Sequence, residues 1–549
     1  MFDRFCRWLL LPLSAAFACL LLAAPAALAA KTPSVAFQLD GHTETIALIQ
    51  SINLWTLMLP SSVNPGDLTG VNGLELPDLS DVPTDQESSV RVTINGKKAR
   101  LRILPSQNAG SVFIDLDRMS LSQFGSSKKR KDTGSCRVFD AEGHFSAEGR
   151  LASFSLHGNS TLIAKKKSFN LKFEKKQALL GMEADRSWAL ISNAHDSSFT
   201  RNYTAMTLAE LLHMPFVPEQ KPVDVYLNGQ YLGAYLLSEK VQIGKGRVEI
   251  RDLAKETEEM NDHPLTEYRQ LGSKKPVKGQ GKYYDIPTDP EDITGGYLME
   301  LGLEDRYPQM TSAYVTQRGQ IISFRSPKYL SQAQYEYISG LLQSMENAMF
   351  SEDGTDPDSG KRFEELVDLD SAALKYMFEE LVCNFDANKT SQFFWKDADS
   401  KDPLIHFGPP WDYDLSLANR AGEDGKEFIT ADALAVGVQV RMKLPVYYRQ
   451  VYQLQVVRDR LPSLFQEAGV REAVEQLTQG GEKSISAWTE NLGLSIEKNY
   501  IINPTRFFAA YTHAFGTDFR RHAQSISDFL YKRMEYLETL YQGFQNTDP

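Results

Sequence analysis

The chain has 549 residues, 42% of them hydrophobic, and a formal net charge of −12. This length exceeds what one hydrophobic core usually holds, so two or three domains are expected. The acidic balance argues against a nucleic-acid partner, because phosphates repel a net negative protein. Four cysteines are too few for a disulfide scaffold. Whether Cys136 and Cys383 pair depends on the distance between their Cα atoms, which the sequence does not give.

Residues 1–30 have the pattern of an export signal. Arg4 and Arg7 precede a long apolar run that ends in small residues at Ala27 to Ala29. A retained membrane anchor is the alternative, although prolines interrupt the run. No later stretch approaches about 18 uninterrupted apolar residues. We therefore expect an exported protein, in a periplasm, on a cell surface or outside the cell, without a transmembrane segment once the signal is removed. Its oligomeric state is not predicted.

Residues 31–125 contain short segments of alternating hydrophobicity separated by turn residues, which predicts a small N-terminal β-rich domain. Asn95-Gly96 is a typical hairpin turn within it. Residues 126–135 are interpreted as a linker. The basic run at 128–131 within this linker is interpreted as a solvated loop, because no aromatic residues are interleaved with it.

Residues 137–300 begin with further strands, and the apolar spacing over 197–214 predicts a helix that Pro215 ends. A hairpin is expected at Asn228-Gly229. The charged insert 254–292 has few apolar positions and is expected to be mobile. Residues 301–549 are predicted to be mainly helical from Asp370 onward. The expected fold class is α+β.

Two acidic segments lie close together in the sequence. NFDAN contains Asp386 and Asn388, and PPWDYDLSLAN contains Asp412 and Asp414. Oxygen ligands of this kind suit divalent cations. The second segment also matches a calcium loop at several positions, but that loop needs glycine at its sixth position, where Leu417 stands. The chain has no HExxH, Walker A, GxSxG or CxxC pattern, so zinc-protease, P-loop and serine-hydrolase interpretations have no support.

A second group of candidates lies in the β-rich part. In KSFNLKF, Lys167 shares a strand face with three apolar side chains, so it either meets an anion or extends to water from the frayed start of the strand. Before it lies a turn of small residues, Gly158, Asn159, Ser160 and Thr161, which could approach phosphates or could be only a turn. Glu239 ends an apolar strand face and is either a partner of Lys167 or a solvent-exposed residue.

Arg201 stands in the first turn of the predicted helix, where a cation is unfavourable. A fixed anion nearby would explain this position, and Asp196 is the candidate.

Five segments together resemble the CotH family, the spore coat protein H-like atypical kinases. In chain order they are HGNST with KKSFNLKF, WALISNAHDSSFTRN, VDVYLNGQYLGAYLLSEKV, GGYLME, and NFDAN with PPWDYDLSLAN, over about residues 137–420. The family usually has Arg where this chain has His157. Neither the N-terminal domain nor the charged insert belongs to the family's core.

The resemblance implies an atypical protein-kinase-like fold with two lobes, a β-rich one at 137–300 and a helical one at 301–549, which binds ATP with Mg²⁺ or Mn²⁺ between them. By position, Lys167 would be the phosphate lysine, and Gly158, Asn159 and Ser160 would cover the phosphates. Asp386 would be the catalytic aspartate, with Asp412, Asp414 and Asn388 near the metal. Glu239 would pair with Lys167 or lie where backbone groups meet adenine.

The expected activity is transfer of the ATP γ-phosphoryl group to Ser or Thr of a secreted or surface protein. Because ATP is scarce outside the cytoplasm, a non-catalytic surface, coat or assembly protein on the same scaffold is the alternative. A calcium-stabilised adhesion protein is a third hypothesis, which would leave Lys167 without a role.

Overall fold

The computed structural model describes residues 32–52, 54–384, 386–387, 390–419, 447–503 and 517–545. The expected export signal and Asn388 lie outside these residues. The described chain is mixed α and β, with a β-rich N-terminal part and a helical C-terminal part, as the sequence predicted. No helix among the described residues is long and apolar enough to cross a bilayer.

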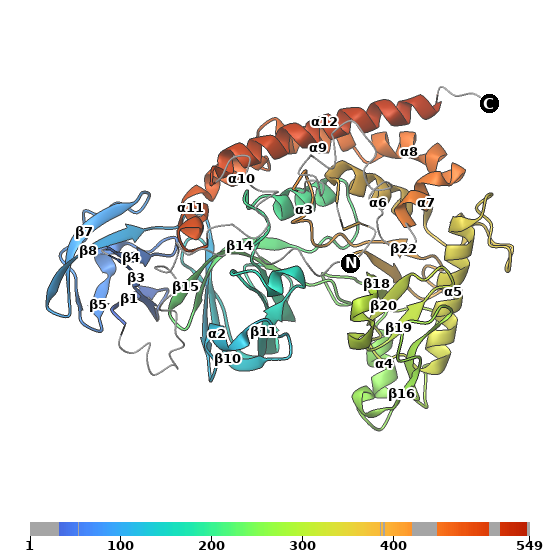
Figure 1. The fold of residues 1–549 in the computed structure, drawn as a ribbon, viewed down its shortest axis with the longest axis horizontal. Helices are drawn as coiled ribbons and strands as arrows, with labels where there is room; N and C mark the ends of the chain where they lie inside the picture. Colours follow the sequence, from blue (N-terminus) through green and yellow to red (C-terminus); the bar gives the residue numbers. More distant parts are fainter. Residues whose placement is uncertain are drawn as a thin grey trace, which may run out of the picture.

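The N-terminal part forms two small sheets at one end of the molecule (Figure 1). The expected hairpin at Asn95-Gly96 joins β7 to β8, with both residues at positive φ. One N-terminal sheet has the order β2-β1-β5, and the other has the order β3-β4-β8-β7-β6. Their strands are β1 (Ser34–Leu39), β2 (His42–Ala47), β3 (Ile49–Ser51), β4 (Leu54–Met58), β5 (Thr69–Val71), β6 (Leu74–Glu75), β7 (Ser88–Ile94) and β8 (Lys97–Leu104).

A closed barrel of seven strands follows, in the order β10-β11-β12-β13-β15-β14-β9. All neighbours are antiparallel except β14 and β9, whose parallel pairing closes the barrel. The β14–β15 connection is the hairpin predicted at Asn228-Gly229. The strands are β9 (Gly110–Leu116), β10 (Lys131–Phe139), β11 (Phe145–His157), β12 (Ser168–Gln177), β13 (Asp185–Ile191), β14 (Gln220–Leu227) and β15 (Gln230–Ser238).

The barrel includes segments from both sides of the linker expected at 126–135. β9 belongs to the barrel rather than to the N-terminal sheets, and β10 begins at Lys131 and pairs with it. A short helix, α2 (Leu121–Phe124), lies between these two strands and buries Phe124 in the barrel core. The basic run is therefore part of a short connection within one sheet.

A further sheet, which we call the second sheet, has seven antiparallel strands in the order β16-β17-β19-β20-β18-β21-β22. The charged segment 254–292, expected to be mobile, contains α4 and two of these strands, because Tyr283 and Tyr284 give it an apolar anchor against α5 and Tyr329. The strands are β16 (Gln270–Gly272), β17 (Gln280–Tyr284), β18 (Tyr297–Gly302), β19 (Ala313–Val315), β20 (Ile321–Ser326), β21 (Phe393–Lys396) and β22 (His406–Phe407).

The C-terminal helices cover this sheet and extend back to the barrel, with α12 running along one side of the molecule (Figure 1). α11 packs against β15 of the barrel. The helices after α2 are α3 (Arg201–Leu211), α4 (Leu253–Glu259), α5 (Gln332–Phe350), α6 (Leu369–Val382), α7 (Tyr447–Gln453), α8 (Gln455–Glu467), α9 (Val470–Thr478), α10 (Ile485–Asn491), α11 (Gly493–Ile502) and α12 (Phe519–Gln545).

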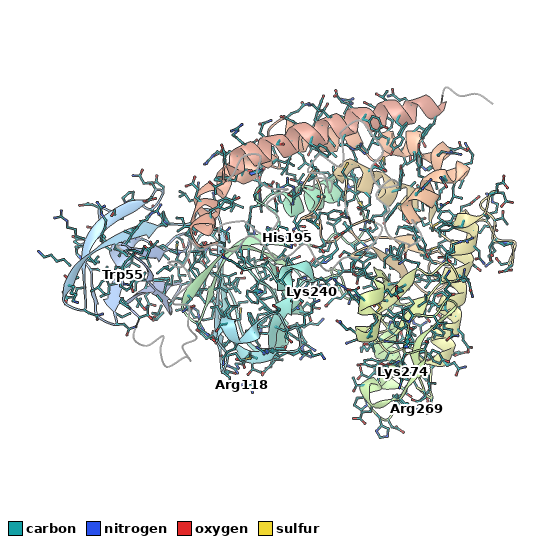
Figure 2. All side chains as sticks on the ribbon, in the orientation of Figure 1. Trp55, Arg118, His195, Lys240, Arg269 and Lys274 are labelled. Carbon is teal, nitrogen blue, oxygen red and sulfur yellow. The ribbon has the colours of Figure 1, made fainter. Side chains whose placement is uncertain are left out.

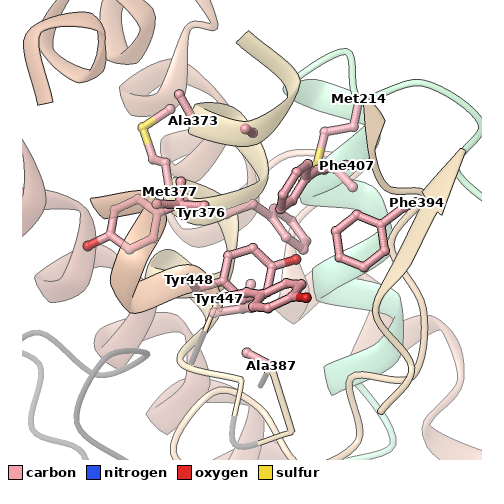
Figure 3. Packing of buried hydrophobic residues seen from close by; sticks show 14 of the residues in the cluster. Met214, Ala373, Tyr376, Met377, Ala387, Phe394, Phe407, Tyr447 and Tyr448 are labelled. Carbon is pink, nitrogen blue, oxygen red and sulfur yellow. The ribbon is translucent and has the colours of Figure 1, made fainter. Parts of the chain in front are cut away.

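The largest apolar core lies between the second sheet and these helices. Tyr447 and Tyr448 of α7 pack there close to Phe394 of β21 and Phe407 of β22 (Figure 3). The two tyrosines are fully buried, so this core supports the chain segments that leave α6 and β22. Those segments carry the acidic residues singled out in the sequence.

Candidate active site

Three aspartates predicted from the sequence come together. Asp386 lies in the turn after α6, and Asp412 and Asp414 lie in the segment after β22. The Asp412 side chain keeps contact with solvent. Partial desolvation by the protein atoms around it, followed by repulsion from Asp386, raises its pKa to about 6. The pKa of Asp414 is also raised well above its usual value, first by burial and then by Asp412 and Asp386. Three carboxylates therefore share one electrostatic environment.

Local backbone features direct these side chains. α6 ends at Cys383 in the left-handed conformation, and the side chain of Asn384 accepts the N–H of Asp386 at 3.0 Å. Asp412 has a φ of 68°, which Asp tolerates better than most residues. The hydroxyl of Ser391 donates to the Asp412 carboxylate at 3.1 Å, so one polar contact already fixes Asp412.

Residues of and before α3 hold the segment that contains Asp414. The Tyr413 N–H donates to the side chain of Asn202 at 2.8 Å, and the Arg201 guanidinium donates to the carbonyl of Ser416 at 3.1 Å. Arg201 also forms a buried ion pair with Asp196 at 2.5 Å, which explains the cation in the first turn of α3. The expected anion partner is thus confirmed.

The same aspartate explains why α3 starts later than predicted. Asp196 accepts the backbone N–H groups of Ser198 and Arg201. These bonds hold residues 196–200 as a turn, because a short acidic side chain competes with helical bonding. The helix therefore begins at Arg201 and not at Ser197.

A fully buried polar network lies behind Tyr413. The Lys375 ammonium forms an ion pair with Glu379 and also donates to Gln392 at 2.9 Å and to the Tyr413 hydroxyl at 3.0 Å. Tyr413 in turn donates to Glu379 at 2.8 Å, and Tyr448 donates to Gln392 at 2.8 Å. All three donors of the lysine are used. Because Tyr413 stands between Asp412 and Asp414, this network fixes the backbone that carries both carboxylates.

The turn of small residues lies between β11 and β12. Gly158 has a φ of 86°, and a Cβ atom there would meet the Thr161 hydroxyl at 1.9 Å, so only glycine fits. The side chain of Asn159 accepts from Lys128 at 2.7 Å. Ser160 begins a short 3₁₀ turn, Ser160–Leu162.

Lys167 lies one residue before β12, half-buried, and its ammonium donates to the carbonyl of Leu162 at 2.5 Å. The lysine that enters the protein interior is its neighbour Lys166. That ammonium lies 4.4 Å from the ring centre of Tyr235, and burial lowers its pKa well below the usual value. The alternation pattern predicted that Lys167 points toward the core and made no prediction for Lys166. β12 begins at Ser168, so the alternation does not extend to Lys167.

Glu239 has partners other than Lys167. Its carboxylate accepts the N–H of Glu219 at 3.1 Å and lies 4.0 Å from the Arg247 guanidinium. Among the described residues no ion pair joins Glu239 to Lys167, so that predicted pairing is wrong. Its solvent-exposed alternative is also wrong, because Glu239 is 3% exposed. Sequence spacing could not indicate Arg247, which follows in a separate turn.

His157 connects the turn to the acidic segment. Its ring lies edge-on to Trp411, with ring centres 6.3 Å apart, and Trp411 directly precedes Asp412. The Asn170 side chain lies 3.0 Å from both the His157 ring nitrogen and the Lys240 ammonium. Burial, with the nearby positive charge of Lys240, lowers the pKa of His157 to about 3. The imidazole is therefore neutral at pH 7.

Several residues of this region escaped the sequence analysis. Asn170 and Lys240 are neighbours of His157, while Ser391 and Glu300 lie beside Asp412: Ser391 donates to Asp412, and its own N–H donates to Glu300 at 3.1 Å. Asn170 lies on the polar face of KSFNLKF, and that alternation was the available signal. Lys240 and Glu300 lie within two of the segments that carry the family resemblance, but no local pattern indicates their neighbours in space, and Ser391 lies outside those segments.

A protein-family model, described as CotH kinase protein, matches residues 154–537. The chain belongs to the CotH family. The match includes both acidic segments, the turn at Gly158 and the α3 region that holds Asp414. It begins within β11 and leaves out the N-terminal sheets, β9 and β10. No curated protein matches the chain.

Proposed function

We propose that this CotH-family protein is an exported protein kinase that transfers the γ-phosphoryl group of ATP to Ser or Thr of a secreted or surface protein. The observation that carries the proposal is the convergence of Asp386, Asp412 and Asp414, where burial and then mutual repulsion raise the pKa of Asp412 and Asp414. In the kinase-like interpretation, the barrel is the N-terminal lobe, and the second sheet with its helices is the C-terminal lobe.

The carboxylates fit a divalent cation. Oxygen ligands suit Mg²⁺ or Mn²⁺, and close like charges are unfavourable without a counter-ion. Asp412 and Asp414 would hold the metal, with Asn388 as a further candidate. Bound there, Mg²⁺ would neutralise charge on the phosphates. Ser391 and the buried Lys375 network hold the two carboxylates in place.

In the proposed transfer, the acceptor hydroxyl oxygen forms a bond to the γ-phosphorus, and the bond between that phosphorus and the β,γ-bridging oxygen breaks. The electron pair of the broken bond leaves with ADP. Asp386 accepts the hydroxyl proton. Lys167 would contact the phosphates after releasing the carbonyl of Leu162, and Gly158, Asn159 and Ser160 would lie over them. Glu239, whose carboxylate accepts the N–H of Glu219, would order the strand end where the nucleotide base would lie.

The test measures transfer of label from γ-labelled ATP, with Mg²⁺ or Mn²⁺, to the protein itself and to a generic acceptor. Asp412→Asn and Asp386→Asn are each expected to lose about 100-fold or more of the activity. Asp85→Asn, the same change at an exposed N-terminal residue, is expected to retain it. Calorimetric titration with Mn²⁺ provides a second readout, in which Asp412→Asn binds more weakly.

If the wild-type protein neither binds nucleotide nor transfers label, the kinase proposal fails, and a non-catalytic surface or coat role takes its place. If activity survives Asp412→Asn, the metal assignment fails. Tight Ca²⁺ binding without any nucleotide binding would favour the calcium-stabilised alternative.

A further inference from the structure

Seven basic side chains from the two sheets converge beside the candidate active site. We call them the basic cluster. Those from the barrel side are Lys128, Lys131, Lys172 and Lys240, and those from the second sheet and its loops are Arg306, Arg325 and Lys328. Figure 2 shows Lys240 at the centre of the molecule, between the barrel and the second sheet.

Strand register brings three members together: Lys131 of β10 lies opposite Ser155 of β11, which lies opposite Asn170 of β12, and Lys172 follows on the same strand. Lys240 donates to that Asn170. Lys128 experiences the positive charges of Arg306 and Arg325, and burial together with these charges lowers its pKa to about 8. The pKa of Lys240 is lowered to about 8 by burial, and then by charges that include Arg325. Lys328 is affected by burial first and then by Lys131, Arg325 and Lys172. Chain segments distant in sequence thus bring like charges together.

A few carboxylates act on the cluster among the described residues, and Glu300 near Lys128 and Asp185 near Lys240 are two of them. Arg325 forms an ion pair with Glu300, and Arg306 lies 3.9 Å from its sequence neighbour Asp305. In the described part of the chain, none of the five lysines forms an ion pair with a carboxylate. Lys131, Lys172 and Lys328 are exposed. A bound anion would relieve the repulsion among these positive charges, in a chain whose net charge is −12.

Polar contacts join this cluster to the candidate active site. Arg325 binds Glu300, Glu300 accepts from the N–H of Ser391, and the Ser391 hydroxyl donates to Asp412. On the barrel side, Lys240 and His157 share Asn170, and His157 contacts Trp411 beside Asp412. A chain bound across the cluster would therefore pass next to the three aspartates.

We propose that the basic cluster is the docking surface for the acceptor, and that it binds an acidic polypeptide segment adjacent to the Ser or Thr that receives the phosphoryl group. This inference rests on the proposed function. A single triphosphate, already met by a metal and Lys167, needs fewer charges than the seven that extend over both sheets. A long nucleic acid is disfavoured, because beyond the cluster it would meet a net acidic protein.

The test is direct binding of fluorescent peptides by anisotropy at low salt. The probes are two peptides and one nucleic acid. The peptides are a Glu/Asp-rich 12-residue peptide with a central Ser and its Lys/Arg-rich counterpart, and the nucleic acid is a single-stranded oligo-dT of equal length. The variant Lys131→Glu/Lys172→Glu/Lys328→Glu changes only exposed side chains. The matched control, Lys274→Glu/Lys275→Glu/Lys278→Glu, changes the net charge equally. Lys274 lies at the outer end of the second sheet, away from Lys240 (Figure 2).

The acidic peptide is expected to bind the wild-type protein, and the cluster variant is expected to bind it about tenfold or more weakly, with the control unchanged. Saturating ATP with Mg²⁺ is expected to leave peptide binding intact. Three results would each overturn the proposal: no binding of the acidic peptide, equal losses in both variants, or tighter binding of oligo-dT. Displacement by ATP would assign the cluster to the nucleotide instead. Peptide binding without any phosphoryl transfer would support the docking surface while the kinase proposal fails.

Discussion

Removal of the buried lysine behind Tyr413 should be among the most damaging single changes in the helical part. Lys375 and Glu379 are both 0% exposed, and the variant Lys375→Met leaves the Glu379 carboxylate with Tyr413 as its remaining described donor. Loss of one partner of a buried ion pair costs about 3 to 5 kcal/mol, because the remaining charge is uncompensated. We expect the free energy of unfolding in urea to fall by this amount.

The double variant Lys375→Met/Glu379→Gln separates charge from packing. It removes both charges and keeps an acceptor for Tyr413, so its cost should be only about 1 to 2 kcal/mol from lost hydrogen bonds. Lys532→Met, on the exposed face of α12, is the control and should change stability by less than about 0.5 kcal/mol. The reasoning is refuted if Lys375→Met costs less than about 1 kcal/mol or if the double variant is as unstable as the single one.

Three further predictions concern other buried groups. Lys498→Met should lower the free energy of unfolding by about 3 to 5 kcal/mol, because the ammonium pairs with fully buried Asp224 at 2.9 Å. A smaller loss of stability in Lys498→Met/Asp224→Asn would support this cause, and an equal loss would oppose it. Burial depresses the pKa of His157 to about 3 from 6.5, so its contribution is complete above pH 6.5 and declines as the pH falls toward 3. Between pH 7 and 5, urea unfolding should show the wild type losing about 1 to 2 kcal/mol more than His157→Gln, and parallel pH profiles would contradict it. Cys136 and Cys383 are free and buried, so a reductant should leave the melting temperature unchanged, whereas a drop would reveal a disulfide.

Local patterns in the sequence predicted the elements whose cause is local. The hairpins at Asn95-Gly96 and Asn228-Gly229 follow from turn residues that accept positive φ. Asp386, Asp412 and Asp414 were recognised together because short polar loops carry them between apolar segments. Asp196 was found as the partner of Arg201 because a cation in a first helical turn needs an explanation.

Features that depend on contacts between distant segments were not predictable. The parallel pairing of β9 with β14 joins residues more than a hundred positions apart, and no spacing rule indicates it. The absence of interleaved aromatic residues predicts a solvated loop for the basic run at 128–131. Arg306 and Arg325, whose charges act on Lys128, lie far away in the sequence, so no local pattern indicates them. Lys166 and not Lys167 is the buried lysine. The alternation did not indicate this, because β12 begins one residue later than the pattern implied.

The segment that matches the CotH family model is shorter than the segment needed to close the barrel, because it begins within β11. A recombinant fragment starting at residue 154 would lack β9, β10 and most of β11, leaving β14 and the remaining residues of β11 each with an unpaired edge. Open edges of this kind favour aggregation. A fragment starting at Gly110 would still expose Phe113 and Phe139, which pack with the N-terminal sheets. Truncation studies of this kinase-like protein should therefore retain the chain from Ser34 onward.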